Sequence, residues 1–470
     1  MTRPRIEIVR RRFVGMKWCR LVAIAASIFG RICAARPAQC AACDPEGDGE
    51  DASLLSRRVD PRRGSAVVLV ESAAADGAGT MSFVEWARRF ARRGNATQFR
   101  DTSVVISEVV PFLELEPSPP LKPLPLRSTP RSPMTSSSCA AFGDGVFTGK
   151  RKAPVKVIDV SVMGFDLDVL EMKFHELRDE VDLFFVIEMP WSLKGVKRPL
   201  MWRRNVDKPR FSIFKDKVVS IVVPELPKGS EPQKTASSNT SFTIEHWQEH
   251  EGMVLVRSEL EARGMKQGDV VMLFGDADEI AAPHLLHLMR HCEPKALPVD
   301  VGTWMPMGLM TRAFRTDWPV DRGDPSVAFT FGNPAFHDPF ARKEAGGAWR
   351  TFGGSGLYVL GGWHLTNYLY PPARLIKTLS MPSYAGHIDA SDMHLLGQDV
   401  PGYFEKGKDS WAPSRFKNTS ELLRVEPYRS RPELLQPPAI MIRNPERYGM
   451  WYGKLDSRVD EHIPWGTSHW

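Results

Sequence analysis

The pattern of apolar residues changes regularly between positions 155 and 290. Apolar runs are typical of strands buried in a parallel sheet, and they occupy residues 183–187, 218–223 and 270–274. Residues 155–162 are mostly β-branched and also predict a strand. In the segments between these strands, apolar residues recur every three or four positions, which is the spacing of one helix face; these segments are residues 167–181, 242–263 and the stretch after Pro283. Asp166 stands at the cap position of the first of them. Strands alternating with helices predict an α/β fold, with a mostly parallel sheet flanked by helices.

The remaining pattern predicts three regions along the chain. Residues 1–36 are basic and contain a short apolar run, as in a targeting or signal-anchor segment. Residues 37–149 predict a poorly ordered stem, because 111–138 are rich in Pro and Ser; one stretch, 83–93, has helical spacing. Residues 150–470 predict the main folded domain, which is aromatic-rich after 300 and ends in a Pro-rich tail of expected irregular structure.

The charge of the N-terminal segment and the length of its apolar run limit the roles that this segment can have. Residues 1–36 hold nine Lys or Arg and one Glu, a net +8 against +6 for the whole chain, so the remainder carries −2. The basic character therefore belongs to one end and gives no face for nucleic acid. The apolar run at 21–30 is shorter than the roughly 20 residues of a bilayer span but fits the 7–15 of a signal peptide. A cleaved signal, a short membrane anchor and a disordered start all remain open.

Cysteine positions predict no disulfide in the main domain. Five of the six lie before residue 150, which leaves Cys292 alone within the domain. The pair Cys40 and Cys43 has a metal-like spacing but no second pair, and is expected to be incidental. Three sequons, at Asn95, Asn239 and Asn418, give weak support for a secreted protein.

An acidic motif follows the strand predicted at 270–274. Asp276, Asp278 and Glu279 stand where α/β sheets bind ligands, beyond the carboxyl end of a strand. Carboxylate oxygens suit a hard divalent cation, which can also bridge a substrate diphosphate. The alternative is an acidic turn with no ligand. Glu279 either orients the metal site or lies in the first turn of the next helix.

Four segments in order resemble glycosyltransferase family 17, the β-1,4-mannosyl-glycoprotein N-acetylglucosaminyltransferases. The first is Phe185-Val186-Ile187-Glu188 with Gly195, Lys197, Pro199 and Leu200; the second is Arg257 with Leu260; the third is Gly268-Asp269-Val270-Val271 with Gly275-Asp276-Ala277-Asp278-Glu279-Ile280; the fourth is Gly362-Trp363-His364 with Lys377, Ser383, Tyr384 and His387. The resemblance covers about residues 155–390.

The resemblance implies a GT-A-like nucleotide-diphospho-sugar transferase fold and makes 150–470 a glycosyltransferase catalytic domain. The implied reaction moves GlcNAc from UDP-GlcNAc to a mannose of an N-glycan or glycoprotein, with inversion and with a divalent metal, Mn²⁺. The implied location is the secretory pathway, in the Golgi membrane or lumen. The implied roles are metal binding by Asp276 and Asp278; catalysis by Asp278, Glu279 and His364; donor binding by Glu188, Lys197, Arg257 and Asp276; and acceptor contact by Trp363, Lys377 and His387.

Departures from the family pattern leave alternatives open. Ala281 stands where the family commonly has Pro, and Leu365 begins a stretch that usually includes a Cys. One alternative is therefore a non-catalytic glycan-binding protein, and another is a related transferase with a different donor or acceptor. A nucleotidyltransferase is disfavoured because residues 160–165 form no Gly-rich phosphate loop. The general base also stays open among Asp317, Asp338 and Glu344.

Overall fold

The computed structural model describes residues 81–92, 102–116, 119–125, 134–141, 145–226, 238–266, 268–307, 309–314, 326–330, 357–365, 371–380, 416–418 and 435–452. The predicted targeting segment, 1–36, lies outside these residues. Within them, no helix combines the length and the apolar character that a membrane crossing requires.

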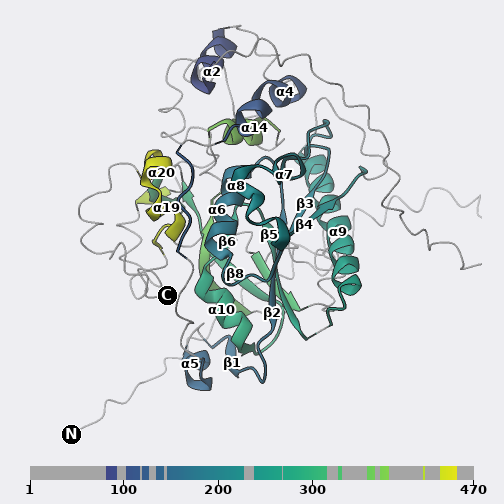
Figure 1. Cartoon of the computed structure of the whole chain (residues 1–470), viewed down its shortest axis with the longest axis vertical. Helices are drawn as coiled ribbons and strands as arrows, with labels where there is room; N and C mark the ends of the chain where they lie inside the picture. Colours follow the sequence, from purple (N-terminus) through teal and green to yellow (C-terminus); the bar gives the residue numbers. More distant parts are fainter. Residues whose placement is uncertain are drawn as a thin grey trace, which may run out of the picture. The chain divides into compact units, whose positions relative to one another are not determined.

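An eight-stranded mixed sheet forms the centre of the structure (Figure 1). One half is parallel, in the order β4-β3-β2-β5: β4 (Val218–Val222), β3 (Leu183–Glu188), β2 (Lys156–Val162) and β5 (Val270–Asp276). These are the four strands predicted from the sequence pattern. The other half adds, in order, β11 (Ser326–Thr330), β8 (Val299–Trp304), β12 (Leu357–His364) and β6 (Glu279–Ala281). In this half β12 runs parallel to β8, whereas β11 and β6 pair antiparallel with their neighbours.

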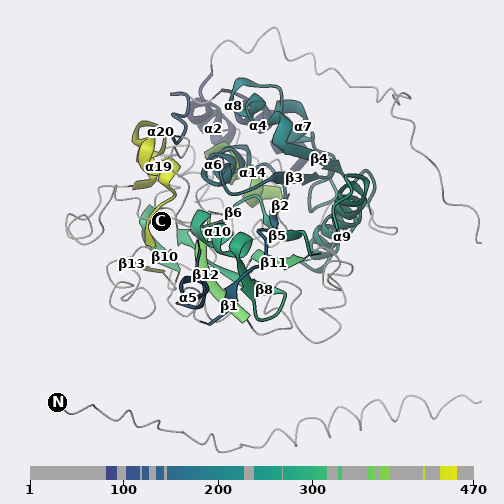
Figure 2. The same ribbon diagram turned by 60° about the horizontal axis from the view of Figure 1, so that its bottom comes forward.

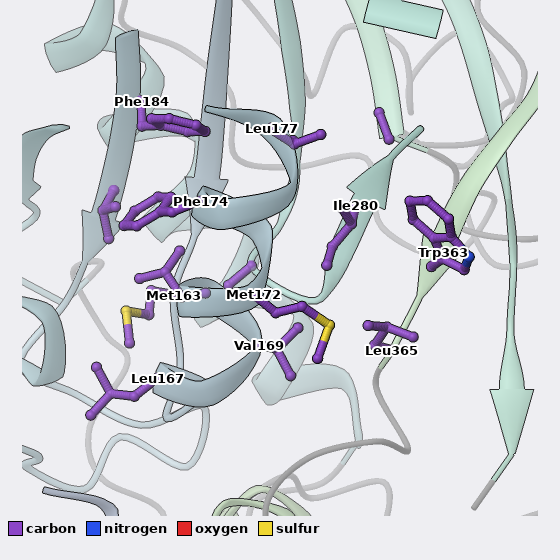
Figure 3. Close-up of a cluster of buried hydrophobic side chains, with 14 of the residues drawn as sticks. Met163, Leu167, Val169, Met172, Phe174, Leu177, Phe184, Ile280, Trp363 and Leu365 are labelled. Atoms are coloured by element: carbon purple, nitrogen blue, oxygen red, sulfur yellow. The ribbon is translucent and has the colours of Figure 1, made fainter. Parts of the chain in front are cut away.

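Helices cover both faces of the parallel half, which explains its continuous apolar runs. Alternate residues of each strand enter two separate clusters, as the two-residue period requires: Phe184 and Val186 pack on one face, and Phe185 and Ile187 on the other. The first face carries α6 (Leu167–Leu177) and α10 (Pro283–His291), and the second carries α9 (Ser238–Ala262) (Figures 1 and 2). Figure 3 shows the first cluster, to which α6, β3, β6, β12 and the residues just after β2 and β12 contribute Met163, Leu167, Val169, Met172, Phe174, Leu177, Phe184, Ile280, Trp363 and Leu365.

Strand order places a topological switch point between β2 and β5. The chain leaves β2 for β3 on one side, whereas the later strand β5 pairs with β2 on the other side. At such a point the loops beyond the carboxyl ends diverge and leave a crevice that binds ligands in open α/β sheets. The register pairs Val162 with Asp276, so the acidic motif begins at this edge.

The predicted stem contains ordered helices that join the main core. α2 (Phe83–Arg92) and α4 (Thr102–Leu113) bury Trp86, Phe90, Val105 and Val109, and these belong to the same cluster as α6. α4 packs against α14 (Pro371–Ser380), a helix that comes much later in the sequence. Apolar burial explains the difference, because the stripe at 102–113 is a core face and not a linker. The boundary at residue 150 itself stays a prediction.

The prediction that Cys292 is alone is wrong. Cys139, in α5 (Ser136–Ala141), forms a disulfide with Cys292, in β7 (Cys292–Pro294). β7 also pairs with β1 (Phe147–Lys150), so the bond and the two-stranded sheet fix the same corner. Sequence spacing hid the pair, since 153 residues separate the two cysteines and connectivity cannot be deduced from sequence alone.

Two short helices occupy part of the tail predicted to be irregular, and there that prediction is wrong. α19 (Ala439–Arg443) packs on α6, and α20 (Pro445–Tyr452) follows it. Arg447 of α20 donates to Glu171 (2.7 Å) and Asp168 (3.1 Å) of α6. Arg210, from α8 (Pro209–Ser212), donates to the same two carboxylates. We call Asp168, Glu171, Arg210 and Arg447 the clasp cluster.

Short elements complete the described fold. α7 (Met201–Asn205) and the 3₁₀ turn η1 (Lys215–Lys217) lie between β3 and β4 in the chain. A separate three-stranded sheet has the order β13-β10-β9, with β13 (Phe416–Asn418), β10 (Leu309–Phe314) and β9 (Pro306–Met307).

Candidate functional site

The acidic turn after β5 is held rigidly at the switch point. The amide of Ala277 donates to the carbonyl of Val162 (2.9 Å), which ties the turn to the end of β2. The amide of Asp276 donates to the carboxylate of Glu279 (3.0 Å). Glu279 is fully buried and begins β6, four residues before α10, so the alternative that it lies in the first helical turn is wrong. Its carboxylate instead fixes the backbone that presents the two aspartates.

Asp278 lies beside a lysine from a distant segment. Its Oδ2 accepts from Nζ of Lys377 at 2.6 Å, and Lys377 is also 3.7 Å from Oδ1 of Asp166. His364 Nε2, at the end of β12, lies 3.8 Å from Asp278 Oδ1. The structure thus brings Asp278, from the third predicted segment, together with His364 and Lys377, both from the fourth. We call Asp166, Asp276, Asp278 and Lys377 the edge cluster.

Burial and charge set the protonation of this cluster. Burial raises the pKa of Asp166 above its ordinary value, and the nearby Asp278 and Asp276 raise it further, while Lys377 opposes them. Burial alone would lower the pKa of Lys377, but Asp166 and Asp278 outweigh burial and raise it. Lys377 therefore stays charged at neutral pH. Asp166 occupies the cap position of α6 but makes no side-chain cap bond, so its carboxylate serves the cluster and not the helix.

Asp276 has a different set of neighbours from Asp278. Carboxylate oxygens of Asp276 and of Glu245 and Glu249, one turn apart on α9, all lie within 4.8 Å of one another. Three carboxylates at this separation match the oxygen donors that a divalent cation prefers. Sequence motifs do not single out Glu245 or Glu249; their four-residue spacing on the predicted helix 242–263 was the available signal.

Close packing of α9 on β3 brings these glutamates to the edge. A Cβ at Gly252 would lie 2.5 Å from Cγ2 of Ile187, so only glycine permits this approach. Gln248, beside Glu249, donates its side-chain amide to the carbonyl of Ile187 (3.2 Å). The helix is thus locked to the carboxyl end of β3, within reach of Asp276.

Glu188, predicted to bind donor, holds a helix in this structure. It ends β3, is fully buried, and accepts from the backbone amides of Trp202 (2.7 Å) and Arg203 (3.0 Å) in α7. Burial raises its pKa, and the bond from Trp202 opposes that shift. Its carboxylate is directed at the loop after β3 and shapes that loop.

Lys197 and Arg257, also predicted to bind donor, lie on the surface. Lys197 is exposed in the loop after β3, with Nζ 5.4 Å from the ring centroid of Trp191. Arg257 pairs with Glu261 one turn along α9 (2.8 Å), and both side chains are about half exposed.

The strand β12 supplies the acceptor-side residues. Trp363 is buried and donates from Nε1 to the carbonyl of Gln436 (2.6 Å), which ties β12 to the C-terminal segment. Gly362 has φ +146°, and a Cβ there would lie 2.3 Å from the carbonyl oxygen of Ile280. This close pairing with β6 sets His364 opposite Glu279. His387, and the base candidates Asp317, Asp338 and Glu344, lie outside the described residues.

A buried lysine beneath the turn was missed by sequence reasoning. Lys173 of α6 forms an ion pair with Asp159 (3.0 Å), donates to Ser161 Oγ (2.6 Å) and reaches the carbonyl of Asp276 (3.4 Å). Asp159 and Ser161 interrupt the apolar run of β2 on the face toward α6. Polar residues inside a buried strand were the signal, since such groups require partners.

Comparison with known proteins supports the family suggested by the motifs. Residues 106–308 match the model described as glycosyltransferase family 17. Over 132 residues the chain is 28% identical to the β-1,4-mannosyl-glycoprotein 4-β-N-acetylglucosaminyltransferase of Homo sapiens, and 27% identical to that of Mus musculus. Each alignment covers 28% of this chain and 23% of the relative, so the chain matches about a quarter of the length of these curated relatives.

Proposed function

Because residues 106–308 match the model of glycosyltransferase family 17, we propose that the protein is a metal-dependent inverting N-acetylglucosaminyltransferase. It transfers GlcNAc from UDP-GlcNAc to a mannose of an N-glycan, in a β-1,4, bisecting-type linkage. The observation that carries this proposal is the acidic edge at the switch point of the parallel sheet, inside the matched segment. The transferred GlcNAc, the mannosyl-glycoprotein acceptor and the linkage follow the names of these relatives, and the UDP-linked donor follows the family resemblance.

The divalent cation, proposed to be Mn²⁺, is assigned to Asp276 with Glu245 and Glu249. The fit rests on the donor set, since three carboxylates converge within 4.8 Å, whereas Asp278 already accepts from Lys377 at 2.6 Å. A bound cation there would neutralise charge on the leaving diphosphate. This departs from the expectation that Asp278 is the direct ligand.

The residues of the chain have separate tasks in the proposed reaction. The acceptor hydroxyl attacks the anomeric carbon, the bond to the diphosphate oxygen breaks, and UDP leaves with that electron pair. His364 is partly accessible and has a carboxylate 3.8 Å from Nε2, so it is the base that we assign to accept the hydroxyl proton. Lys377 holds Asp278, and Glu279 holds the turn, so both fix the geometry in which attack occurs.

The disulfide supports a location in the secretory pathway, in the Golgi lumen or at its membrane. Structural disulfides form and persist in oxidising compartments, and Cys139–Cys292 joins two buried cysteines. N-glycan acceptors are found in the same pathway.

Release of UDP from UDP-GlcNAc by the full chain tests this function. The assay contains an N-glycan acceptor with its mannose core and is run with and without Mn²⁺. We expect metal-dependent turnover that falls about 10²-fold or more in Asp276→Asn, the size typical for loss of a key electrostatic group. Asp269→Asn is the matched control, because Asp269 is an exposed residue at the opposite end of β5.

A glycan-binding protein without activity is the second candidate. Lys377 favours it, because a cation of the chain itself already contacts Asp278 and Asp166. Absence of turnover with every UDP-sugar, together with glycan binding that persists in Asp276→Asn, would select this alternative.

A further inference from the structure

Lys194 lies in the loop after β3 at a turn built to hold its position. Gly195 has φ +69°, a conformation that favours glycine. The amide of Gly195 donates to the carbonyl of Ser192 (2.8 Å), and the Ser192 hydroxyl accepts from the amides of Lys194 (3.3 Å) and Val196 (3.2 Å). The backbone of Lys194 is therefore fixed relative to the parallel sheet.

The ammonium of Lys194 reaches the end of α14. Nζ donates to the carbonyl of Leu379 at 2.5 Å and lies 3.3 Å from Oγ1 of Thr102, the first residue of α4. Thr102 is buried and its hydroxyl also reaches the Leu379 carbonyl (3.5 Å). The last carbonyls of a helix lack intrahelical partners and interact favourably with a cation. Lys194 thus ties the last turn of α14 to the sheet and to α4.

The same helical turn carries Lys377. Only one residue separates it from Leu379, and its ammonium extends to Asp278 and Asp166. Leu375, Ile376 and Leu379 of α14 are buried, so packing supports the helix as a whole. The charged contact to Leu379 acts on the final turn, where helices fray.

We propose that Lys194 is a positioning residue for the edge cluster: its bond to Leu379 holds the last turn of α14 so that Lys377 stays on Asp278. The kinetic consequence rests on the proposed function, whereas the structural consequence does not. Lys194 touches neither Asp278 nor Asp166 in any described contact, so its effect passes through α14.

Amine acylation of Lys377 measures this positioning without any activity assay. The full chain is treated with a trace of an N-hydroxysuccinimide ester, and labelling of each lysine is followed by mass spectrometry. In the native chain Lys377 is held by two carboxylates and should react slowly. In Lys194→Met, loss of a charged hydrogen bond should raise its labelling about tenfold. Asp278→Asn is the positive control, since it removes the acceptor at 2.6 Å.

Lys208 provides the matched control. Its ammonium also donates to a backbone carbonyl near a helix end, that of Glu114 just after α4, and none of its described hydrogen bonds reaches α14. Lys208→Met removes a comparable lysine–carbonyl tie while leaving Leu379 untouched. We expect its Lys377 labelling to match the native chain. Equal increases in both variants would show that general loosening, and not Lys194, exposes Lys377, and would overturn the proposal.

Kinetics then separate this inference from the function on which it rests. If the native chain transfers GlcNAc, Lys194→Met should lower kcat about tenfold with a smaller change in KM for UDP-GlcNAc, and Lys194→Arg should restore much of it. Unchanged Lys377 labelling in folded Lys194→Met overturns the inference even if transfer is observed. Raised labelling in a chain without transferase activity upholds the positioning role and refutes only the proposed function.

Discussion

Two clusters of charged side chains lie at the first turns of α6, and they differ in the balance of positive and negative groups. In the clasp cluster, Asp168 and Glu171 face two guanidinium groups, those of Arg210 and Arg447. In the edge cluster, Asp166 and Asp278 share the ammonium of Lys377, and Asp276 adjoins two glutamates of α9. The guanidinium of Arg198 is a further positive charge that lowers the pKa of Asp166. The hydrogen bonds of this guanidinium go to the backbone carbonyls of Met163, Gly164 and Trp191.

The difference predicts a structural role for the clasp cluster and a functional role for the edge cluster. Matched charges with bidentate arginines satisfy each other and hold α20 to the domain. Carboxylates in excess repel one another, and the fold tolerates that cost only where the site gains something, such as a bound cation. The clasp cluster is therefore expected to govern stability, and the edge cluster to govern binding and activity.

Breaking the clasp cluster should give the largest loss of stability. Arg447→Met leaves Asp168 and Glu171 with Arg210 alone, and removal of one partner from a buried ion network costs about 3–5 kcal/mol of the free energy of unfolding. Urea denaturation at constant pH measures the loss. Arg443→Met, at an exposed position of the neighbouring helix α19, is the control. A loss no larger than the control's would show that the clasp cluster is not structural.

Acid should weaken α6 through His175, which lies in the last turn of this helix. Burial, with smaller effects of Arg178 and Arg447, lowers the pKa of this buried histidine to about 4. Between pH 6.5 and 4, His175 is protonated in the unfolded chain but stays neutral in the folded chain. The free energy of unfolding therefore falls as the pH falls. The loss relative to pH 7 should be about 2 kcal/mol at pH 5.

His175→Gln should remove most of that pH dependence, as measured by urea denaturation at pH 7 and pH 5. His250 is partly exposed and is the matched control, so His250→Gln should keep the full dependence. A wild-type stability that does not change between the two pH values would contradict the assignment.

The smallest change in stability is expected at the edge cluster. Asp276→Asn removes one of the carboxylates that crowd within 4.8 Å, so the free energy of unfolding should stay within about 1 kcal/mol or increase slightly. Thermal unfolding without metal measures this, beside Asp269→Asn. A loss as large as that of Arg447→Met would erase the distinction between the two clusters.

The pattern of apolar residues predicted the parallel half of the sheet, because a strand that is buried on both faces consists mostly of apolar residues. Strands β2, β3, β4 and β5 therefore appeared within two residues of their observed bounds. Helices α4 and α20 were not predicted, because the Pro-rich segments next to them in the sequence suggested irregular chain. Their burial depends on residues that are distant in the sequence. The disulfide escaped for the same reason, since its two cysteines are 153 residues apart.

The site was only partly predictable from motifs. Motifs indicated Asp276, Asp278, His364 and Lys377 as candidate site residues, and the structure places the last three side by side. Glu245 and Glu249 were missed because a pair of acids on a helix normally signals solvent. Glu188 and Lys377 received roles from family position, whereas their contacts depend on α7 and α14, whose placement no local pattern contains.

Mn²⁺ affinity of the full chain and two variants tests the central claim most directly. Titration calorimetry or manganese EPR compares the native protein with Asp276→Asn and Asp278→Asn. The two-cluster account predicts that Asp276→Asn loses affinity about tenfold or more, while Asp278→Asn, whose carboxylate already holds Lys377, changes it far less. Loss of Mn²⁺ binding in Asp278→Asn with full retention in Asp276→Asn would contradict the account.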